Sequence, residues 1–304
     1  QTPYDEINRA MHRGHGTQDS IDANRRLRDS GFKVGFHMMP GQPGMSQEMC
    51  LEDFRRIFEE SEWRPDYLKI YPTLVVEGTA VYDMWHRDEF EPLDNDSAAE
   101  LVAEIKSMIP RYTRLQRVQR DIPADHIEGG VWKSNLRQLA RQRMDDHDWT
   151  CDCIRCREVG HNDEAPETVE MDIMTYEVGG GTEHFISFED FEKDLLVGFC
   201  RLRFPNDPVR RELENAAIVR ELHVYGSQVG VGHAAQAASE TAGEADVDQH
   251  QHQGYGQALL AEAERLAVEA GYPKLAVISG IGVRQYYREK LDYRQDGPYV
   301  SKRL

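Results

Sequence analysis

The chain of 304 residues is long enough for two domains, and its formal net charge is −18. It has neither a run of about 18 apolar residues nor a charged-then-apolar leader, so it predicts no membrane span and no secretory signal, and we expect a cytoplasmic protein. Strong acidity argues against a nucleic-acid ligand except where basic residues gather locally. Because the sequence opens on Gln1 rather than Met, we treat it as a fragment of a longer protein.

Strand-like and helix-like patterns alternate in the first part of the chain. Strand-like apolar runs occupy residues 31–39, 67–76 and 112–119. Residues 46–61 carry apolar side chains at helical spacing, and Ser97 is a suitable N-cap for a second helix that Pro110 stops. Successive βα units predict parallel strands with right-handed crossovers, and therefore part of a barrel or of a doubly wound sheet.

The pattern changes twice after residue 120. Residues 121–161 are rich in Pro, Gly and paired charges, which favours a connecting module. Strand-like runs then occupy residues 168–178, 194–204 and 216–225. Residues 226–250 contain no Lys or Arg and few apolar side chains, so we expect a loop there. A glycine loop, a helix, a strand, a helix and a final strand complete the predicted order.

The glycine loop at residues 251–256 has the features of a phosphate-binding turn. Gly254 and Gly256 lack a Cβ, so the backbone can approach a pyrophosphate closely, and the N–H groups of the next helical turn point at the anion. The helix after the loop has an apolar stripe that ends at Gly271. A lone G-x-G pattern is more often a structural turn, but its place between a strand and a helix favours phosphate binding here.

This position of the loop suits an acyltransferase that uses a thioester. Such a reaction needs a grip on phosphates, polarisation of the thioester carbonyl and an acid for the departing thiolate. Backbone N–H groups of residues 221–224 are candidates for polarisation, and Glu221 or His223 is the candidate base. Adjacent helical residues point about 100° apart. We therefore expect one of Tyr286 and Tyr287 to pack inward and the other, for which we favour Tyr287, to act as the acid.

Three of the five cysteines are grouped at Cys151, Cys153 and Cys156. Three thiolates within six residues can bind one Zn²⁺, and an odd number of cysteines does not suggest a disulfide framework. His147 and His161 are candidates for the fourth ligand, with a more distant residue or water as the alternative. Thiols without a metal are the simpler interpretation. Cys50 and Cys200 stand alone and are predicted to be buried thiols.

A basic stretch at residues 111–143 stands out in the acidic chain. It has eight Lys or Arg against three acidic residues, a local net charge of +5. Arginine binds phosphates bidentately and stacks on unpaired bases, so this stretch is a candidate contact for folded RNA. A solvated surface with internal ion pairs is the alternative interpretation.

Two groups of motifs resemble one known family. In the C-terminal half they are residues 218–226, 251–256, 276–280 and 286–288. In the N-terminal half they are residues 38–44, 67–73, 117–123 and 134–138. Together they resemble the catalytic subunit of Elongator, the tRNA wobble-uridine acetyltransferase, over nearly the whole chain.

The resemblance implies an α/β fold in three parts. These are the C-terminal part of a radical S-adenosylmethionine βα barrel at residues 1–120, a basic linker with zinc-binding cysteines at 121–164, and a GNAT acetyltransferase domain at 165–304. It also implies an acyltransferase that uses acetyl-CoA to modify carbon 5 of the wobble uridine of tRNA, giving a carboxymethyluridine-type product. The implied partners are the anticodon loop of tRNA and either accessory subunits or a second copy of the chain.

The resemblance also assigns residues to sites. The implied acetyl-CoA contacts, with two residues of the glycine loop added, are Glu221, Leu222, His223, Val224, Gln251, Gly254, Tyr255, Gly256, Gln257 and Tyr287. The candidate catalytic residues are Tyr287, Tyr286, Glu221 and His223. The candidate tRNA contacts are Arg114, Arg117, Arg120, Lys133 and Arg137. A zinc ion on the three grouped cysteines is implied to be structural.

Two departures from the family pattern stand out. Asp292 replaces a glycine that the family has after its tyrosine pair, so we expect the end of that helix to shift while the site is kept. The three grouped cysteines that hold a 4Fe–4S cluster for S-adenosylmethionine in the family are absent, so we expect this fragment not to carry out a radical step alone. Two other functions stay open: a protein lysine acetyltransferase, and a non-catalytic tRNA-binding scaffold.

Overall fold

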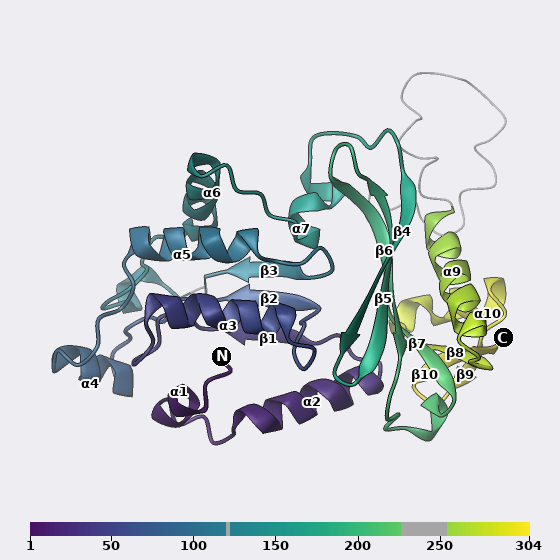
Figure 1. Ribbon diagram of the computed structural model, residues 1–304, viewed down its shortest axis with the longest axis horizontal. Coiled ribbons are helices and arrows are strands. Elements are labelled where there is room, and N and C mark those ends of the chain that lie inside the picture. The colour runs from purple at the N-terminus through teal and green to yellow at the C-terminus, as the bar shows by residue number, and fades with distance from the viewer. Residues whose placement is uncertain (120–121, 226–253) are drawn as a thin grey trace. The chain divides into compact units, whose positions relative to one another are not determined.

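The computed structural model describes residues 1–119, 122–225 and 254–304, which form two compact units (Figure 1). Unit 1 comprises Gln1–Arg25 and Val34–Cys156, and unit 2 comprises Arg26–Lys33 and Arg157–Leu304. The loop expected over residues 226–250 lies outside the described residues. In the described part of the chain, every helix is too short or too polar to cross a membrane.

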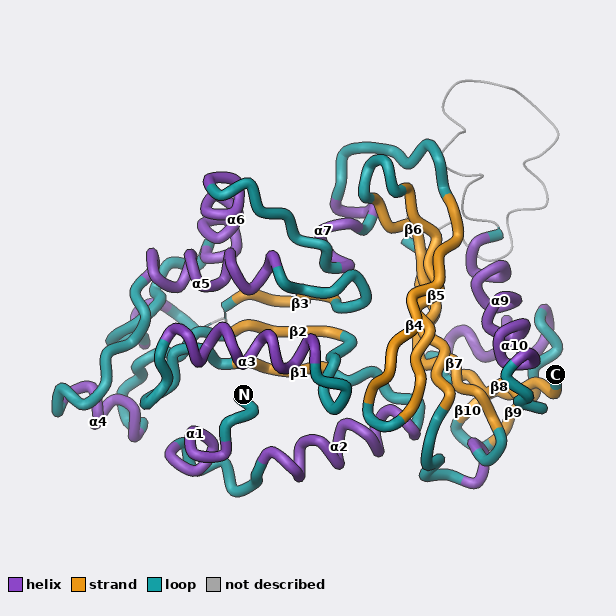
Figure 2. The backbone as a smooth tube through the Cα atoms, viewed as in Figure 1, coloured by secondary structure: helices purple, strands orange, loops and turns teal. Residues whose placement is uncertain are grey.

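Unit 1 is built on a three-stranded parallel sheet whose strands lie side by side (Figure 2). The strands, in sheet order, are β1 (Gly35–Met38), β2 (Tyr67–Ile70) and β3 (Arg114–Val118). The helices that follow β1 and precede β3 are α3 (Gln47–Glu59) and α5 (Asn95–Ser107). Leu68, Ile70 and Leu115 are fully buried in one core with apolar residues of both helices. This arrangement confirms the predicted βα units, although each strand is shorter than its apolar run.

Several helices of the first half were not predicted from the sequence. They are α1 (Asp5–Ala10), α2 (Thr17–Asp29), α4 (Ala80–His86), α6 (Leu136–Asp146) and α7 (Ile154–Arg157). Helix α6 lies in the stretch that we expected to be an irregular connecting module. Its Leu136, Ala140 and Met144 recur every fourth residue and are buried in the core of unit 1. A narrow apolar stripe among many arginines was enough to form this helix.

The start of helix α5 corrects one prediction. Ser97 is not the N-cap, because the carboxylate of Asp94 accepts a hydrogen bond from the backbone N–H of Ser97 at 2.7 Å. That hydrogen bond holds the pKa of Asp94 below its usual value. Asp is as good an N-cap as Ser, so the helix starts at Asn95 and Ser97 lies in its first turn.

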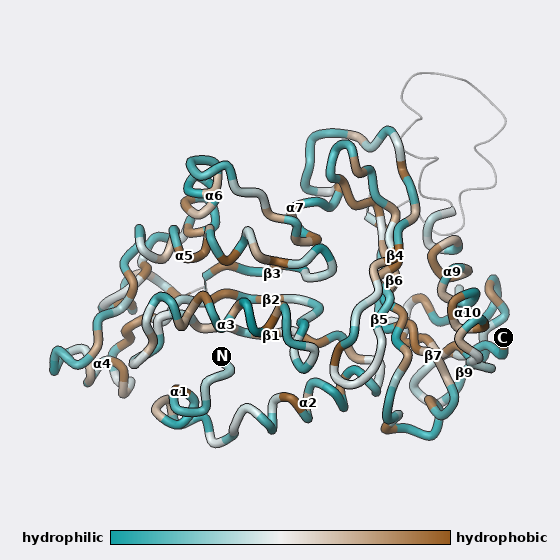
Figure 3. Tube along the Cα trace, viewed as in Figure 1, coloured by the Kyte–Doolittle hydropathy of each residue, from teal (hydrophilic) through white to brown (hydrophobic). Residues whose placement is uncertain are grey.

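Unit 2 is built on a seven-stranded, mostly antiparallel sheet. Its strands, in sheet order, are β4 (Glu170–Val178), β5 (Gly181–Asp190), β6 (Leu195–Phe204), β7 (Ala216–Val224), β8 (Lys274–Val277), β10 (Tyr299–Arg303) and β9 (Arg294–Asp296). Strands β7 and β8 are the parallel pair. The helices α9 (Tyr255–Glu269) and α10 (Arg284–Lys290) follow β7 and β8 in the chain. The apolar residues of β7 and α9, brown in Figure 3, share one core.

Strand β5 was missed in the sequence because its buried side chains are partly charged. Glu183, Glu189 and Asp190 are all buried, although a buried strand usually reads as an apolar run. Each has a partner from another part of unit 2: Glu189, for example, accepts a hydrogen bond from Arg157 at 2.5 Å. A pattern of apolar residues cannot reveal a strand whose interior is neutralised by distant arginines.

A buried group of charges crosses the middle of the sheet of unit 2. Glu183 on β5 binds Arg220 on β7 through two hydrogen bonds of 2.8 and 3.0 Å, and it lies 3.2 Å from Nη1 of Arg203 on β6. Arg203 also donates to Asp29 at 2.6 Å. The side chains of these four residues and of the nearby Arg28 have no exposed surface. We call them the buried charge network.

Replacing Glu183 with Gln should destabilise the chain by about 3–5 kcal/mol, because buried arginines would lose their carboxylate. Urea unfolding measures this loss. Glu269→Gln, which removes an exposed partner of Arg265 on α9, is the matched control and should unfold near the midpoint of the unmodified chain. Equal midpoints for the two variants would show that the network does not stabilise unit 2.

Candidate functional site

The parallel pair β7 and β8 separates halfway along β7. Residues 216–219 of β7 pair with residues 274–277 of β8, and Ile278 N still donates to Val219 O at 3.2 Å. Beyond that point β7 continues to Val224, paired with β6 on its other side. Within the described ranges, the edge of Glu221–Val224 that faces away from β6 has no strand partner. This open edge is where backbone groups are available to an extended ligand.

The first turn of α9 lies beside the end of this open edge. A Cβ added to Gly256 would lie 3.7 Å from Cγ2 of Val224, which places the start of the helix next to β7. Gly254 is the N-cap, and the first turn contains no acidic residue. Free N–H groups at such a helix start attract an anion. Gln251, the remaining loop residue that we predicted to bind acetyl-CoA, lies outside the described residues.

The two adjacent tyrosines of α10 occupy different environments. Tyr287 is 5% exposed and packs in the core of unit 2, with its ring 5.5 Å from that of Tyr293. Burial raises the pKa of Tyr287, so its hydroxyl keeps its proton above the usual pH range. Tyr286 is half-buried, and its hydroxyl accepts a hydrogen bond from Gln257 of α9 at 2.9 Å. The tyrosine that packs inward is therefore Tyr287 and not Tyr286, contrary to our expectation, and the role of Tyr287 as the acid stays a prediction.

The two candidate bases on β7 also differ. Glu221 is bound on both carboxylate oxygens, by Lys33 at 3.1 Å and by Arg201 at 3.0 Å. His223 is exposed, and its ring lies 4.4 Å from that of Tyr225. Both oxygens of Glu221 already accept hydrogen bonds, so the exposed His223 is the more accessible candidate base. No local pattern pointed to Lys33, because it is separated from its partner by 188 residues in the chain.

Leu222 and Val224, both predicted to contact acetyl-CoA, lie on the part of β7 that has the open edge. Both side chains are half-buried and pack against the core of unit 2. Tyr255, the first residue of α9, lies with its ring 4.7 Å from that of Phe188 on β5. These contacts fix the strand and the helix start relative to each other within unit 2.

The end of α10 keeps its geometry despite the loss of a glycine. Asp292 has a φ of 61°, the left-handed conformation that glycine normally provides. Tyr293 N donates to Tyr287 O at 3.1 Å, and Leu291 N donates to the same oxygen at 3.3 Å. Asp is among the non-glycine residues that tolerate this conformation best. Asp292 thus adopts the conformation that a glycine provides, and the expected shift of the helix end stays a prediction.

The three grouped cysteines of unit 1 form a compact cluster. The sulfurs of Cys151, Cys153 and Cys156 all lie within 4.8 Å of one another, and Cys153 is fully buried. Hydrogen bonds from the other two thiols hold the pKa of Cys153 well below its usual value. Leu115 N also donates to this sulfur, and Ile154 N donates to Thr113 O at 3.1 Å. The cluster is thus attached to β3.

Neither histidine that we predicted as a fourth ligand is placed to bind a metal. His147 Nε2 lies 2.8 Å from Glu100, and its ring stacks on Trp149. The Nε2 atom of His161 lies 2.9 Å from the carboxylate of Glu158, and its Nδ1 atom lies 3.2 Å from the carbonyl oxygen of Gly160. In the described ranges, no further His, Cys, Asp or Glu joins the three sulfurs. A ligand from outside them, such as water, is needed to complete four-coordination.

The basic residues predicted to bind tRNA are divided among several places. Arg114 and Arg117 lie on β3, the second of them exposed. Lys133 is half-buried, with its Nζ 5.9 Å from the centre of the exposed Trp132 ring. Arg137 instead donates to Leu115 O at 3.2 Å, and burial and then nearby Arg155 lower its pKa. Arg120 lies outside the described residues.

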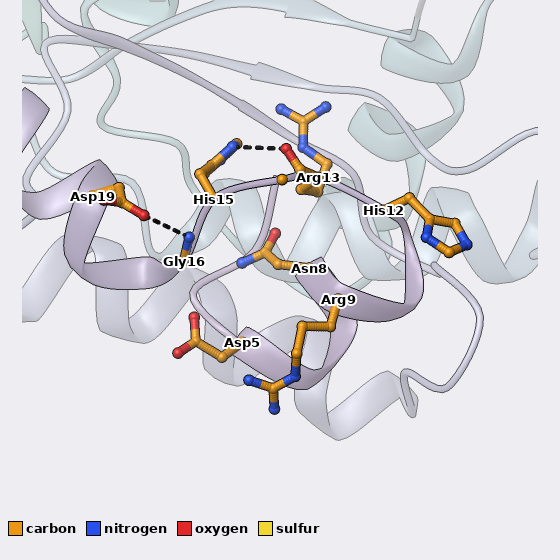
Figure 4. A pocket seen from close by; sticks show the side chains of 9 residues that line it. Asp5, Asn8, Arg9, His12, Arg13, His15, Gly16 and Asp19 are labelled. Carbon is orange, nitrogen blue, oxygen red and sulfur yellow. Dashed lines mark hydrogen bonds between the residues drawn. The ribbon is translucent and has the colours of Figure 1, made fainter.

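A surface pocket of about 580 Å³ lies at the turn between α1 and α2 (Figure 4). Its lining mixes basic and acidic side chains, namely Asp5, Arg9, His12, Arg13, His15 and Asp19. Both carboxylates already accept hydrogen bonds. Asp5 accepts one from the backbone N–H of Thr17, and Asp19 accepts one from the backbone N–H of Gly16 at 2.8 Å. Figure 4 shows the side chains of Arg9, His12 and Arg13 diverging rather than meeting at one point. We assign no chemistry to this pocket.

Comparison with known proteins finds relatives that match the whole chain. Residues 65–146 match the family described as Radical_SAM C-terminal domain. The tRNA uridine(34) acetyltransferase of Methanocaldococcus infernus is 45% identical over 312 residues, which covers 100% of this chain and 56% of that protein. Elongator complex protein 3 of Homo sapiens is 43% identical over 311 residues, covering 100% of this chain and 55% of that protein.

A solved structure gives a fuller match. The archaeal Methanocaldococcus infernus Elp3 with an N-terminal deletion superimposes with a TM-score of 0.90 at 44% identity, covering 100% of this chain and 71% of that chain. The chain spans about half the length of the curated relatives it matches. On this similarity in sequence and structure, the chain belongs to the Elongator complex protein 3 family.

Proposed function

We propose that this chain is part of a tRNA uridine(34) acetyltransferase and binds both acetyl-CoA and tRNA. The observation that carries the proposal is the open edge of β7 next to the first turn of α9. In this proposal residues 1–120 are the C-terminal part of a radical S-adenosylmethionine barrel, residues 121–164 a zinc-bearing linker, and residues 165–304 a GNAT acetyltransferase domain. The similarity to the tRNA uridine(34) acetyltransferases of Methanocaldococcus infernus and Methanocaldococcus jannaschii, each 45% identical to this chain, supports the same reaction.

Acetyl-CoA fits the open edge because it is long and carries its charge at one end. Its pyrophosphate would lie on the N–H groups of the first turn of α9, at Gly254, Tyr255, Gly256 and Gln257. Its extended amide arm would pair with the backbone of residues 221–224, as an added strand does. Backbone N–H groups of the same strand would then polarise the thioester carbonyl.

Side chains on and near β7 would carry out the proton transfers. His223 is exposed and on the open part of β7, so it is the proposed base that activates the acceptor. Tyr287 is the proposed acid for the departing thiolate, because a tyrosine hydroxyl is protonated at neutral pH and can donate a hydrogen bond to the sulfur. Tyr286 binds Gln257 of α9 and is the proposed positioning residue for the helix start. Glu221 holds β7 through its two cations.

The cysteine cluster is proposed to bind structural zinc. Zn²⁺ binds thiolates at about 2.3 Å, so sulfurs within 4.8 Å of one another fit a single ion. A 4Fe–4S cluster spreads its thiolates further, since each binds a different iron. In the described ranges no second group of three cysteines exists, and we derive no radical step for this chain. S-adenosylmethionine chemistry belongs to the longer relatives in this proposal.

The first test of the proposal measures thiol release from acetyl-CoA with and without tRNA. We expect release that tRNA stimulates, and a loss of at least about 100-fold in Tyr287→Phe, because a general acid contributes that much. Tyr286→Phe, which loses the hydrogen bond from Gln257, should weaken acetyl-CoA binding more than it slows release at saturating acetyl-CoA. Since burial raises the pKa of Tyr287, release should not fall through loss of this proton below about pH 10.

Other outcomes of the same assay point to other functions. A loss in Tyr286→Phe with little change in Tyr287→Phe would move the acid to Tyr286. Stimulation by a lysine-containing peptide and not by tRNA would indicate a protein lysine acetyltransferase. Binding of tRNA without any binding of acetyl-CoA would leave a tRNA-binding scaffold as the function.

The second test measures zinc by elemental analysis of the purified chain. We expect about one zinc ion per chain, and close to none in Cys153→Ser, because the buried central thiolate is lost. Cys50→Ser is the control, since this buried thiol lies apart from the cluster and accepts only Gly41 N at 3.2 Å. Equal zinc content in all three proteins would refute the assignment of the cluster.

A further inference from the structure

Tyr293 lies just after helix α10 and packs edge-on against the ring of Tyr287. It is 2% exposed, and the two ring centres are 5.5 Å apart at an interplanar angle of 75°. Asp292, with its left-handed φ of 61°, turns the chain back after the helix, and Tyr293 N donates to Tyr287 O at 3.1 Å. Tyr293 is therefore attached to Tyr287 through both its backbone and its ring.

The hydroxyl of Tyr293 connects this pair of rings to helix α9 and strand β10. It donates to Oε1 of Glu264 on α9 at 2.9 Å. Lys302 on β10 binds both oxygens of that carboxylate, at 3.0 and 2.9 Å, and its Nζ lies 5.7 Å from the centre of the Tyr293 ring. Hydrogen bonds to an ionised acceptor are roughly twice as strong as neutral ones. We call Tyr293, Glu264 and Lys302 the tyrosine anchor.

The tyrosine on the other side of Tyr287 is bound to the same helix. The hydroxyl of Tyr286 accepts a hydrogen bond from Gln257 at 2.9 Å. Gln257 and Glu264 are about two helical turns apart, so both lie on one face of α9. In the chain, Tyr287 therefore lies between two tyrosines whose hydroxyls are both held by that face.

Helix α10 is too short to fix the position of Tyr287 by itself. It has seven residues, and isolated helices shorter than about 12 residues are marginal in water. Among the described residues, no side chain caps its N-terminus. Its position in unit 2 therefore depends on contacts with neighbouring elements, and the tyrosine anchor supplies one of them directly beside Tyr287.

We propose that Tyr293 is a positioning residue for the proposed acid Tyr287, and that Glu264 and Lys302 hold it in place. The inference rests on the proposed function, in which Tyr287 gives its proton to the departing thiolate. A general acid has to lie within hydrogen-bond reach of the atom that receives the proton. A displacement of about 1 Å can lower the rate about 100-fold. The edge-to-face contact fixes the Tyr287 ring, and the hydrogen bond to Glu264 keeps Tyr293 from moving.

The test measures thiol release over a range of acetyl-CoA concentrations in the presence of tRNA. Tyr293→Phe, which removes only the hydroxyl, should lower kcat about 10-fold, the effect of one lost hydrogen bond to a charged group. Its KM should change less than about 2-fold, because this hydroxyl does not contact acetyl-CoA in the proposed site. Glu264→Ala should have the same effect. Glu264→Gln should restore most of the rate, since an amide oxygen can accept the same hydrogen bond.

Tyr299→Phe is the matched control for the loss of a buried tyrosine hydroxyl. Tyr299 is also 2% exposed, and its hydroxyl donates to Ser30 O at 2.8 Å. It packs in a different core cluster of unit 2 from Tyr287. Its kcat should equal that of the unmodified chain. An equal loss of kcat in Tyr293→Phe and Tyr299→Phe would show that any buried hydroxyl matters, and the inference would be wrong.

A double variant separates positioning from a general loss of stability. In a Tyr287→Phe background, Tyr293→Phe should change the rate less than about 2-fold, because no acid is left to position. Two losses that multiply in full would mean that Tyr293 acts independently of Tyr287, which contradicts the inference.

Failure of the proposed function gives a different result from failure of the inference alone. If the unmodified chain releases no thiol, or if Tyr287→Phe releases it at the unmodified rate, the proposed acid is wrong and the inference fails with it. If Tyr287→Phe loses activity and Tyr293→Phe does not, only the inference fails. Matching far-ultraviolet circular dichroism spectra check that the variants are folded.

Discussion

Unit 2 depends most directly on the ion pairs that the buried carboxylate of Glu183 forms. This carboxylate lies on β5 and contacts Arg220 on β7 and Arg203 on β6, while Arg203 also binds Asp29. Buried charges are tolerated only when their partners are in place. The three strands therefore have to keep one register, and the segment Arg26–Lys33 has to stay with them, or a bare charge remains in the core.

This constraint extends to the proposed acyl-CoA site. Arg201, two residues before Arg203 on β6, binds Glu221 on β7, and Lys33 binds the other oxygen of that carboxylate. Strand β7 thus pairs with β6 and forms these ion pairs in the region where it no longer pairs with β8. Polarising a thioester requires N–H groups that are fixed before the substrate arrives. A strand held on one side and open on the other meets that requirement.

Local patterns could be predicted from the sequence, and long-range pairings could not. The run of β-forming residues in β6 and the apolar stripe of α9 were enough to predict both elements. The cysteine cluster was predicted because its three members lie within six residues. Its fourth ligand was not, because His147 is taken by Glu100, 47 residues away. Strand β5 was not predicted for the same reason. Its Glu183 and Glu189 can be buried only because arginines from distant parts of the chain pair with them.

The cysteine cluster and two of the basic residues predicted to bind tRNA share strand β3. Leu115 N donates to the sulfur of Cys153, while Arg114 and Arg117 lie on either side of Leu115 along the strand. The buried Arg137 also joins the two, since it donates to Leu115 O and acts electrostatically on the thiols. Binding side chains are positioned most accurately on rigid elements with supporting contacts. A zinc ion bound by the cluster would therefore also hold β3 in place, and with it the backbone positions of Arg114 and Arg117.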